Sequence, residues 1–294
     1  MSTNYVKLIE ELNNPHVHMS DITKVNNLIC SIVAGGKNNL QMIFDFDRTM
    51  TKLNEQTNTH VSSFELLRHC PSISPKYLKA EQEYIDNYCP IEYNRAISDE
   101  EKKALLEKLW MDFAESLKGE PVSYEEILET ATKVEPTLRD GTEKLLADLN
   151  KTNIPVLVVS GGYGDSIEAI FKHFGVLYPN VNIISNFFCF DNGVIQGLKN
   201  SFIINSRNKN DLWSMQPDYL NLIMDRSNIV VVGDSIGDAG VADGIPNVKN
   251  ILKIGFKCKR TNETLSDFLK VFDVVIEDSH TLNVIQGIVK HIFE

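Results

Sequence analysis

Residues 40–51, LQMIFDFDRTMT, form an apolar run that ends in two aspartates one residue apart. Side chains of a strand alternate between its two faces, so Asp45 and Asp47 are predicted to project from the same side, with Phe46 on the other. Two neighbouring carboxylates repel each other unless a cation or a shared proton compensates them. The pattern therefore favours a buried strand that delivers a pair of carboxylates for chemistry.

The composition is that of an ordinary globular protein. The chain has 294 residues, of which 43% are hydrophobic and 23% charged, enough for one large domain or for a core domain with a smaller one. The net charge of −11 opposes a nucleic-acid or anionic-membrane partner, because phosphate groups would be repelled across most of the surface. An anionic small substrate would therefore need a local positive site.

The cysteines and the N-terminal segment predict a cytoplasmic chain. The cysteines are odd in number and widely spaced, with no C-x-x-C pair, so neither a disulfide framework nor a zinc site is indicated. The first residues, MSTNYVKLIEELNN, lack the basic-then-apolar pattern of a signal peptide, and no apolar run approaches the roughly 18 residues of a membrane span. The cysteines are Cys30, Cys70, Cys89, Cys189 and Cys258.

Two patterns divide the chain. Residues 58–137 are predicted to be wholly helical, because four helix starts occur there, three of them with capping-box spacing. From about residue 138, short apolar runs alternate with helical stretches, which is typical of a parallel sheet covered by helices on both faces. We therefore predict an α/β core made of residues 1–57 and 138–294, with a small helical bundle, residues 58–137, inserted as a cap. The helix starts are Ser62, Ser74, Ser98 and Ser123.

One turn inside the second pattern has its own signature. The dipeptide Asn192-Gly193 lies between two apolar runs, as in FDNGVIQG, and favours a two-residue hairpin turn. We expect this hairpin to lie within the main sheet.

Residues that end the apolar runs are candidates for a site, because ligands of such sheets bind beyond the carboxyl ends of the strands. Ser160 ends IPVLVVS, and GDSIGD brings Asp234 and Asp238 after another run. Together with the first aspartate pair, these hard oxygen ligands suit Mg²⁺. Lys209, in the loop NSRNKND, would supply the positive charge that a phosphate still needs.

These residue types predict phosphoryl transfer in two steps. Asp45 would attack phosphorus and form an aspartyl-phosphate, and Asp47 would protonate the leaving oxygen and later deprotonate water. Mg²⁺ bound to Asp45 and Asp234 would help to separate the two roles. Ser160, with backbone N–H groups of the turn that begins at Gly161, would hold the phosphoryl oxygens.

The order of these motifs carries a resemblance. DFDRT after a strand, serine at the end of the next strand, a later lysine and then GDSIGD resemble the four motifs of the haloacid dehalogenase superfamily of phosphohydrolases. More narrowly, LQMIFDFDRTMTK, YCPIEYN, IPVLVVSGGYGDSIEAI and NIVVVGDSIGDAGVADGIPNVKNILKIGF resemble cytosolic 5′-nucleotidase III, a family that includes pyrimidine and 7-methylguanosine-phosphate-specific enzymes. The resemblance spans nearly the whole chain.

The resemblance implies Mg²⁺-dependent hydrolysis of nucleoside 5′-monophosphates, such as CMP, UMP or 7-methyl-GMP, by a Rossmann-like core that a helical cap closes. The chain is then expected to act on a small molecule, as a monomer. The residues that match by motif are Asp45 as nucleophile, Asp47 as acid/base, Asp45, Asp234 and the backbone carbonyl of Asp47 as metal ligands, Ser160, Gly161 and Lys209 at the phosphate, Glu92 at the base, and Asp238 behind the metal ligands.

The chain departs from the family pattern at two places. The family's Ser-Ala after the second strand is Ser160-Gly161 here, which keeps the backbone donor. A cap serine that contacts the base in the family falls at Phe113 or Ala114, so the preference between a pyrimidine and 7-methylguanine stays open.

Simpler interpretations stand beside these. Taken singly, Lys209 is typical of a surface lysine, Ser160 of a helix cap, and Glu92 of a solvated side chain. Trp110 lies on an apolar helical stripe and is interpreted as core rather than as a base-stacking residue. The alternative classes are a phosphatase for another metabolite, such as phosphoserine or a phosphosugar, an inert scaffold of the same fold, and a receiver-like signalling domain, which needs no helical insertion.

Overall fold

The structure, a computed structural model, describes residues 3–53, 60–92, 94, 96–258, 263–277 and 280–293. The predicted boundary between residues 57 and 58 lies outside the described residues. Within these ranges, no helix is long and apolar enough to cross a membrane.

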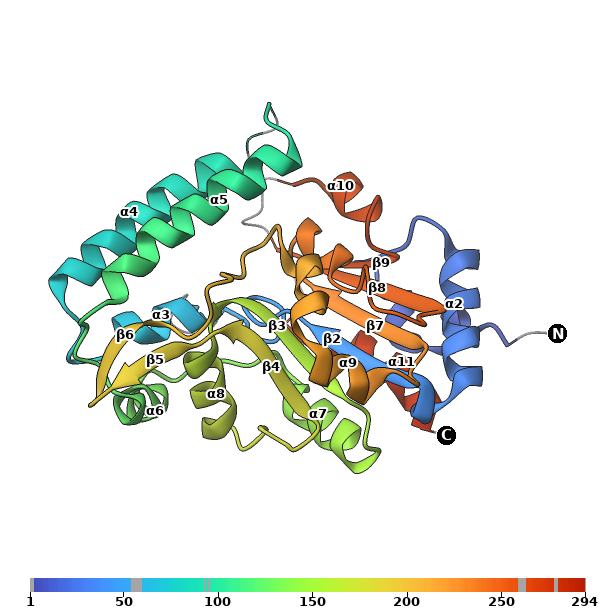
Figure 1. The fold of residues 1–294 in the computed structure, drawn as a ribbon. Helices are drawn as coiled ribbons and strands as arrows, with labels where there is room; N and C mark the ends of the chain where they lie inside the picture. Colours follow the sequence, from blue (N-terminus) through green and yellow to red (C-terminus); the bar gives the residue numbers. More distant parts are fainter. Residues whose placement is uncertain are drawn as a thin grey trace.

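The described part of the chain contains a seven-stranded sheet in the order β1-β9-β8-β7-β2-β3-β4. Every pairing in it is parallel except that of β1 with β9. The apolar run LQMIF forms β2, which is buried throughout and lies between β7 and β3 (Figure 1). The strands are β1 Val17–His18, β2 Leu40–Phe44, β3 Val156–Tyr163, β4 Val181–Asn186, β7 Asn228–Gly233, β8 Asn250–Lys257 and β9 Val274–Glu277.

Helices cover both faces of this sheet, as predicted. Alternate residues of β2 belong to two different apolar clusters, one on each face of the sheet. Met42 and Phe44 belong to the cluster that contains residues of α2, α7, α8 and α11, whereas Ile43 belongs to the cluster that contains residues of η4 and α9. The helices of the core are α1 Tyr5–Leu8, η1 Glu10–Asn13, α2 Ile22–Gly35, η2 Lys37–Asn39, α7 Thr142–Lys151, α8 Gly164–His173, η4 Lys209–Met215, α9 Pro217–Ile223, η5 Ile236–Gly240, α10 Leu265–Leu269 and α11 Asn283–Phe293.

Between β2 and α7, the described residues form four α-helices and a short 3-10 helix. They begin where the sequence predicts, because the side chains of Ser62, Ser98 and Ser123 each accept a hydrogen bond from the backbone three residues later. They divide into two pairs: α4 and α5 pack on each other and project from the sheet, whereas α3 and α6 contact α8 (Figure 1). Their bounds are α3 Ser63–Arg68, α4 Pro75–Glu92, α5 Asp99–Ala114, η3 Glu115–Leu117 and α6 Tyr124–Lys133.

The predicted hairpin forms, but its predicted place in the main sheet is wrong. Strands β5 Phe188–Asp191 and β6 Val194–Leu198 make a separate two-stranded sheet. Asn192 and Gly193 both have positive φ, 49° and 77°, as the tight turn requires. The hairpin leaves the main sheet after β4 because its edge pairs with the inserted segment instead, through an antiparallel bridge between Ile195 and Glu120.

Candidate active site

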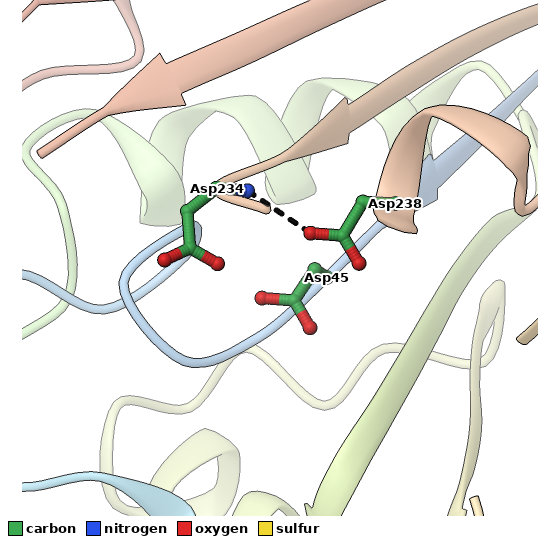
Figure 2. A group of neighbouring side chains, drawn as sticks. All are labelled: Asp45, Asp234 and Asp238. Carbon is green, nitrogen blue, oxygen red and sulfur yellow. Dashed lines mark hydrogen bonds between the residues drawn. The ribbon is translucent and has the colours of Figure 1, made fainter. Parts of the chain in front are cut away.

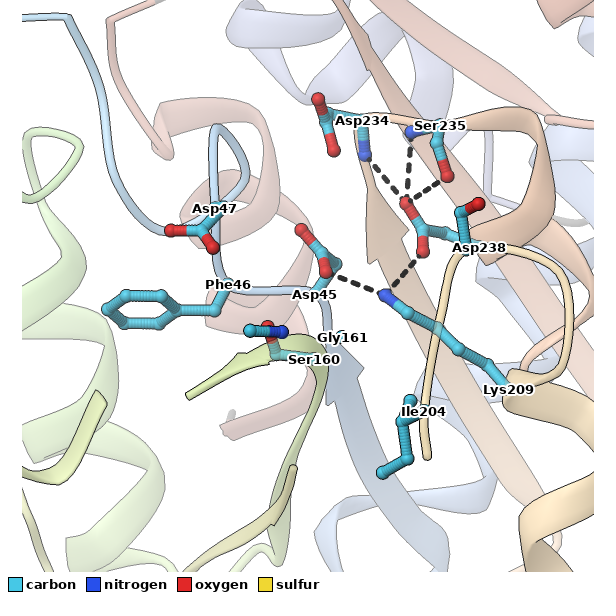
Figure 3. A network of polar contacts seen from close by, with 12 residues as sticks. Asp45, Phe46, Asp47, Ser160, Gly161, Ile204, Lys209, Asp234, Ser235 and Asp238 are labelled. Atoms are coloured by element: carbon cyan, nitrogen blue, oxygen red, sulfur yellow. Dashed lines mark hydrogen bonds and ion pairs between the residues drawn. The ribbon is translucent and has the colours of Figure 1, made fainter. Parts of the chain in front are cut away.

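Three neighbouring strands bring the predicted residues together at their carboxyl ends. Asp45 follows β2, Ser160 lies in the last half of β3, and Asp234 follows β7 (Figure 3). Because β2 lies between β3 and β7 and all three run parallel, their carboxyl ends meet at the centre of the sheet.

A cluster of carboxylates forms the centre of this edge. Asp45, Asp234 and Asp238 each offer an oxygen, and these oxygens lie within 4.8 Å of one another (Figure 2). Asp238 is fixed by the first turn of η5, where its Oδ2 accepts hydrogen bonds from the backbone N–H of Asp234 at 3.1 Å and from both N–H and Oγ of Ser235 at 2.9 Å. Its Oδ1 remains directed at Lys209.

Lys209 is the cation of the cluster. Its Nζ lies 2.6 Å from Asp45 Oδ1 and 2.7 Å from Asp238 Oδ1, and the side chain is almost fully buried (Figure 3). Burial lowers the pKa of Lys209, but Asp238 and Asp45 more than offset it, so the pKa lies above its ordinary value. The side chain is therefore a charged ammonium at neutral pH, and not the surface lysine that it resembles when taken singly.

Carboxyl groups outnumber the single ammonium in this cluster. Burial raises the pKa of Asp45 to about 7, opposed by Lys209 and reinforced by Asp238. Burial, then Asp45 and Asp238, raise the pKa of Asp234 well above its ordinary value. Crowded carboxylate oxygens with unfavourable ionisation are the donor set that a divalent cation compensates, so these residues fit such an ion.

Asp47 is directed away from this cluster by the inserted helices. Its two carboxylate oxygens accept hydrogen bonds from the backbone N–H of Ser63, at 2.8 Å, and from Ser63 Oγ, at the start of α3. Strand β2 ends at Phe44, and Arg48 has a positive φ of 64°, so both aspartates lie in a tight loop rather than on the strand. Strand alternation therefore does not set their directions, and Figure 3 shows the carboxyl of Asp47 turned away from Asp45.

Two glycines of β3, Gly161 and Gly162, lie next to the carboxylate cluster. The Oγ of Ser160, which is 1% exposed, accepts a hydrogen bond from the backbone N–H of Gly162 at 3.1 Å. A Cβ on Gly161 would lie 3.3 Å from the backbone of both Ile204 and Asn205. Gly161 thus lets β3 approach the loop before Lys209 closely.

Glu92 lies at the last turn of α4 and is only 6% exposed. Arg207 contacts both oxygens of the Glu92 carboxylate, with Nη2 at 3.0 Å from Oε1 and Nε at 3.3 Å from Oε2. Ser206 Oγ donates a further hydrogen bond to Oε2 at 3.1 Å. Neither partner of Glu92 was predicted from the sequence, although both belong to NSRNKND, the segment that also contains Lys209.

One cavity of about 740 Å³ unites these groups. Its wall combines the carboxylate cluster with the inserted helices α4 and α5, and with aromatic residues that were not predicted to belong to the site. Phe64 and Tyr84 pack around Trp110, with ring centroids 5.7 and 5.9 Å from it, so Trp110 is core, as predicted, and also borders the cavity. All the predicted site residues line it: Asp45, Asp47, Glu92, Ser160, Gly161, Lys209, Asp234 and Asp238.

Comparisons with known proteins agree on one family. Residues 48–293 match the model of the pyrimidine 5′-nucleotidase family, UMPH-1. The chain is 35% identical over 279 residues to the 7-methylguanosine phosphate-specific 5′-nucleotidase of Drosophila melanogaster, an overlap that covers 94% of this chain and 87% of the relative. The chain belongs to the pyrimidine 5′-nucleotidase family.

Solved structures agree with this membership. The crystal structure of cytosolic 5′-nucleotidase IIIB bound to cytidine has a TM-score of 0.92 and 32% identity, and the match covers 98% of this chain and 97% of that one. A phosphoserine phosphohydrolase-like protein of Francisella tularensis subsp. tularensis SCHU S4, at 21% identity and a TM-score of 0.51, covers 85% of this chain and 99% of that one and shares the fold alone.

The family confirms two predictions from the sequence, the α/β fold of the haloacid dehalogenase type and a 5′-nucleotidase enzyme. The interpretation as a receiver-like signalling domain is therefore wrong. The roles of the individual residues stay predictions, and the structure adds that their side chains lie around one cavity.

Proposed function

We propose that this chain hydrolyses nucleoside 5′-monophosphates, CMP, UMP or 7-methyl-GMP, to nucleoside and phosphate, with Mg²⁺ as cofactor and an aspartyl-phosphate intermediate. One observation carries the proposal: a single cavity has the carboxylate cluster and Lys209 at one part of its wall and aromatic rings with Glu92 at another. A nucleotide has the same division, an anionic phosphate at one end and a planar base at the other.

Asp45, Asp234 and the backbone carbonyl of Asp47 would hold Mg²⁺. When bound, the ion supplies positive charge for the phosphoryl oxygens and relieves repulsion between the carboxylates. Lys209 Nζ, already within hydrogen-bond distance of Asp45, would contribute the second positive charge at the phosphate. Ser160 and the backbone N–H of Gly161 would bind the remaining phosphoryl oxygens.

The chain's own residues then account for both steps. A carboxylate oxygen of Asp45 attacks phosphorus, the P–O5′ bond breaks, and O5′ of the nucleoside takes the proton of Asp47. Water next attacks the aspartyl-phosphate, gives its proton to Asp47 and releases phosphate, which restores Asp45. Ser63 holds the Asp47 carboxyl through its N–H and Oγ, so the acid/base is fixed from the side of the inserted helices.

The base would lie at Glu92 and the aromatic wall. A carboxylate accepts hydrogen bonds from the exocyclic amine of cytosine or from the donors of 7-methylguanine. The Drosophila relative is named for 7-methylguanosine phosphate, and the related crystal structure holds cytidine, which supports both base classes as candidates.

Phosphate release from CMP, UMP, 7-methyl-GMP, AMP, GMP and phosphoserine tests the proposal, with Mg²⁺ and with EDTA. We expect Mg²⁺-dependent release from at least one of the first three, little from AMP, and none with Asp45→Asn. Release from phosphoserine alone would favour the alternative metabolite phosphatase, and no release from any compound would favour an inert scaffold. The monomeric state and the cytoplasmic location stay predictions.

A further inference from the structure

We infer that Arg207 is a positioning residue that leaves Glu92 only one carboxylate oxygen for the base and thereby favours a pyrimidine over 7-methylguanine. The inference rests on the proposed function, because Glu92 is the residue expected to contact the base. Arg207 acts through its contacts with the Glu92 carboxylate and not through direct contact with the substrate.

The contacts of Glu92 leave little acceptor capacity. An ionised carboxylate has about four lone-pair positions, two on each oxygen. Oε2 accepts from Arg207 Nε at 3.3 Å and from Ser206 Oγ at 3.1 Å, which uses both of its positions. Oε1 forms an ion pair with Arg207 Nη2 at 3.0 Å, whereas the hydrogen bond of Nη2 goes to the backbone carbonyl of Glu92 at 3.5 Å. Among the hydrogen bonds of the described residues, the acceptor positions left for a ligand therefore lie on Oε1 and not on Oε2.

Arg207 contacts the Glu92 carboxylate from outside the cavity that Glu92 lines. Glu92 lines the cavity of about 740 Å³, whereas Arg207 lines a neighbouring cavity of about 590 Å³. The guanidinium and the carboxylate are both well buried, with 12% and 7% of their side chains exposed. A buried fork of this kind has a fixed geometry and is not replaced by a single ammonium.

The bases differ in the hydrogen-bond donors that they present to Glu92. On its hydrogen-bonding edge 7-methylguanine presents two adjacent donors, N1–H and the exocyclic amine, which a free carboxylate would accept with both oxygens, and methylation gives the ring a positive charge. Cytosine presents one exocyclic amine and uracil one ring N–H. With Oε2 saturated, only Oε1 is left to accept from the base, so two adjacent donors cannot each take one oxygen. Because Arg207 also compensates its charge, Glu92 attracts a cationic base less than a free carboxylate would.

The structure offers matched controls for cap docking. Arg207 Nη1 also pairs with Asp99 at the start of α5, at 3.3 Å. A separate ion pair joins α5 to the same region of the core, between Lys103 and Asp211, and does not touch Glu92. Lys103→Ala therefore weakens the attachment of the inserted helices without altering the acceptors of Glu92, and Asp99→Asn removes the other partner of Arg207.

The test is the ratio of kcat/KM for 7-methyl-GMP to that for CMP, in wild type, Arg207→Gln, Arg207→Lys, Lys103→Ala and Asp99→Asn. Ribose 5-phosphate, which has no base, measures any general loss. We expect Arg207→Gln to raise the ratio about tenfold, mainly through KM, because one acceptor for a charge-assisted hydrogen bond is freed. Arg207→Lys cannot occupy both oxygens and should raise the ratio less. The two control variants should leave it unchanged.

The outcomes separate this inference from the proposed function. A ratio that is unchanged in both Arg207 variants, or that shifts equally in Lys103→Ala, would overturn the role of Arg207 while leaving nucleotide hydrolysis intact. Wild-type protein that releases no phosphate from any nucleotide would overturn both. If Arg207→Gln fails to fold, Arg207→Lys decides, and the absence of any shift there counts against the inference.

Discussion

Replacing Asp45 by asparagine should stabilise the metal-free protein, and the gain should grow with pH. Burial raises the pKa of Asp45 from an ordinary 3.8 to about 7, with Lys209 opposing and Asp238 adding to the rise. An acid whose pKa is raised on folding favours the folded state below its unfolded pKa, and this contribution is lost as the pH rises through the folded pKa. Asparagine does not ionise, so the variant avoids that loss.

The two pKa values give the size of the effect. One pKa unit corresponds to about 1.4 kcal/mol, so a rise from 3.8 to about 7 corresponds to about 4 kcal/mol of unfolding free energy between pH 4 and pH 8. Burial also raises the pKa of Glu81 to about 7 and of Asp165 to about 6. The prediction therefore concerns the difference between variant and wild type, in which those contributions cancel.

Urea unfolding in EDTA at pH 4 and pH 8 measures this difference. The exposed residue Asp191 provides a matched control as Asp191→Asn. Mg²⁺ added at pH 8 should stabilise the wild type more than the Asp45 variant, because the ion compensates the carboxylates. A variant-minus-wild-type difference that does not change with pH would refute the view that Asp45 is a destabilised buried carboxylate.

Three further changes test the site. Asp47→Asn should lower kcat on the order of 10² to 10⁴-fold with KM nearly unchanged, since proton transfer is lost and binding is not; steady-state kinetics with near-normal kcat would contradict this. Asp234→Ala should raise the Mg²⁺ concentration needed for half-maximal activity, and wild-type activity that survives EDTA would contradict the metal assignment. Glu92→Ala should raise KM for CMP about ten- to a hundredfold more than for ribose 5-phosphate, and equal losses would assign Glu92 to cap closure instead.

Local patterns explain what the sequence predicts well. The helix starts at Ser62, Ser98 and Ser123 depend on a side chain and a backbone N–H three residues away, so they can be read from the sequence directly. Asp45 and Asp234 follow apolar runs, and a parallel sheet brings such strand ends to one edge. The carboxylate cluster was therefore predictable as a set.

Tertiary pairing explains what the sequence did not predict. The turn at Asn192-Gly193 specifies a hairpin, but not which edge the hairpin joins, and burial of Ile195 against the inserted segment decided this. Arg207 meets Glu92 across 115 residues of sequence, and neither side chain carries a local signal of the other. The partners of the Glu92 carboxylate could only be found in the folded chain.

The central position of β2 has a consequence for the order in which the protein folds. The strand and Asp45 are synthesised early, but the neighbouring strands β3 and β7 come much later, and Lys209 lies 164 residues after Asp45. Pairing over such separations is slow, because loop-closure entropy must be lost before any contact forms, whereas α4 and α5 can pair locally. On a ribosome-bound chain, α4 and α5 can therefore pair before β7 has left the ribosome. At that stage Asp45 and Asp47 still lack Asp234 and the strand that positions it.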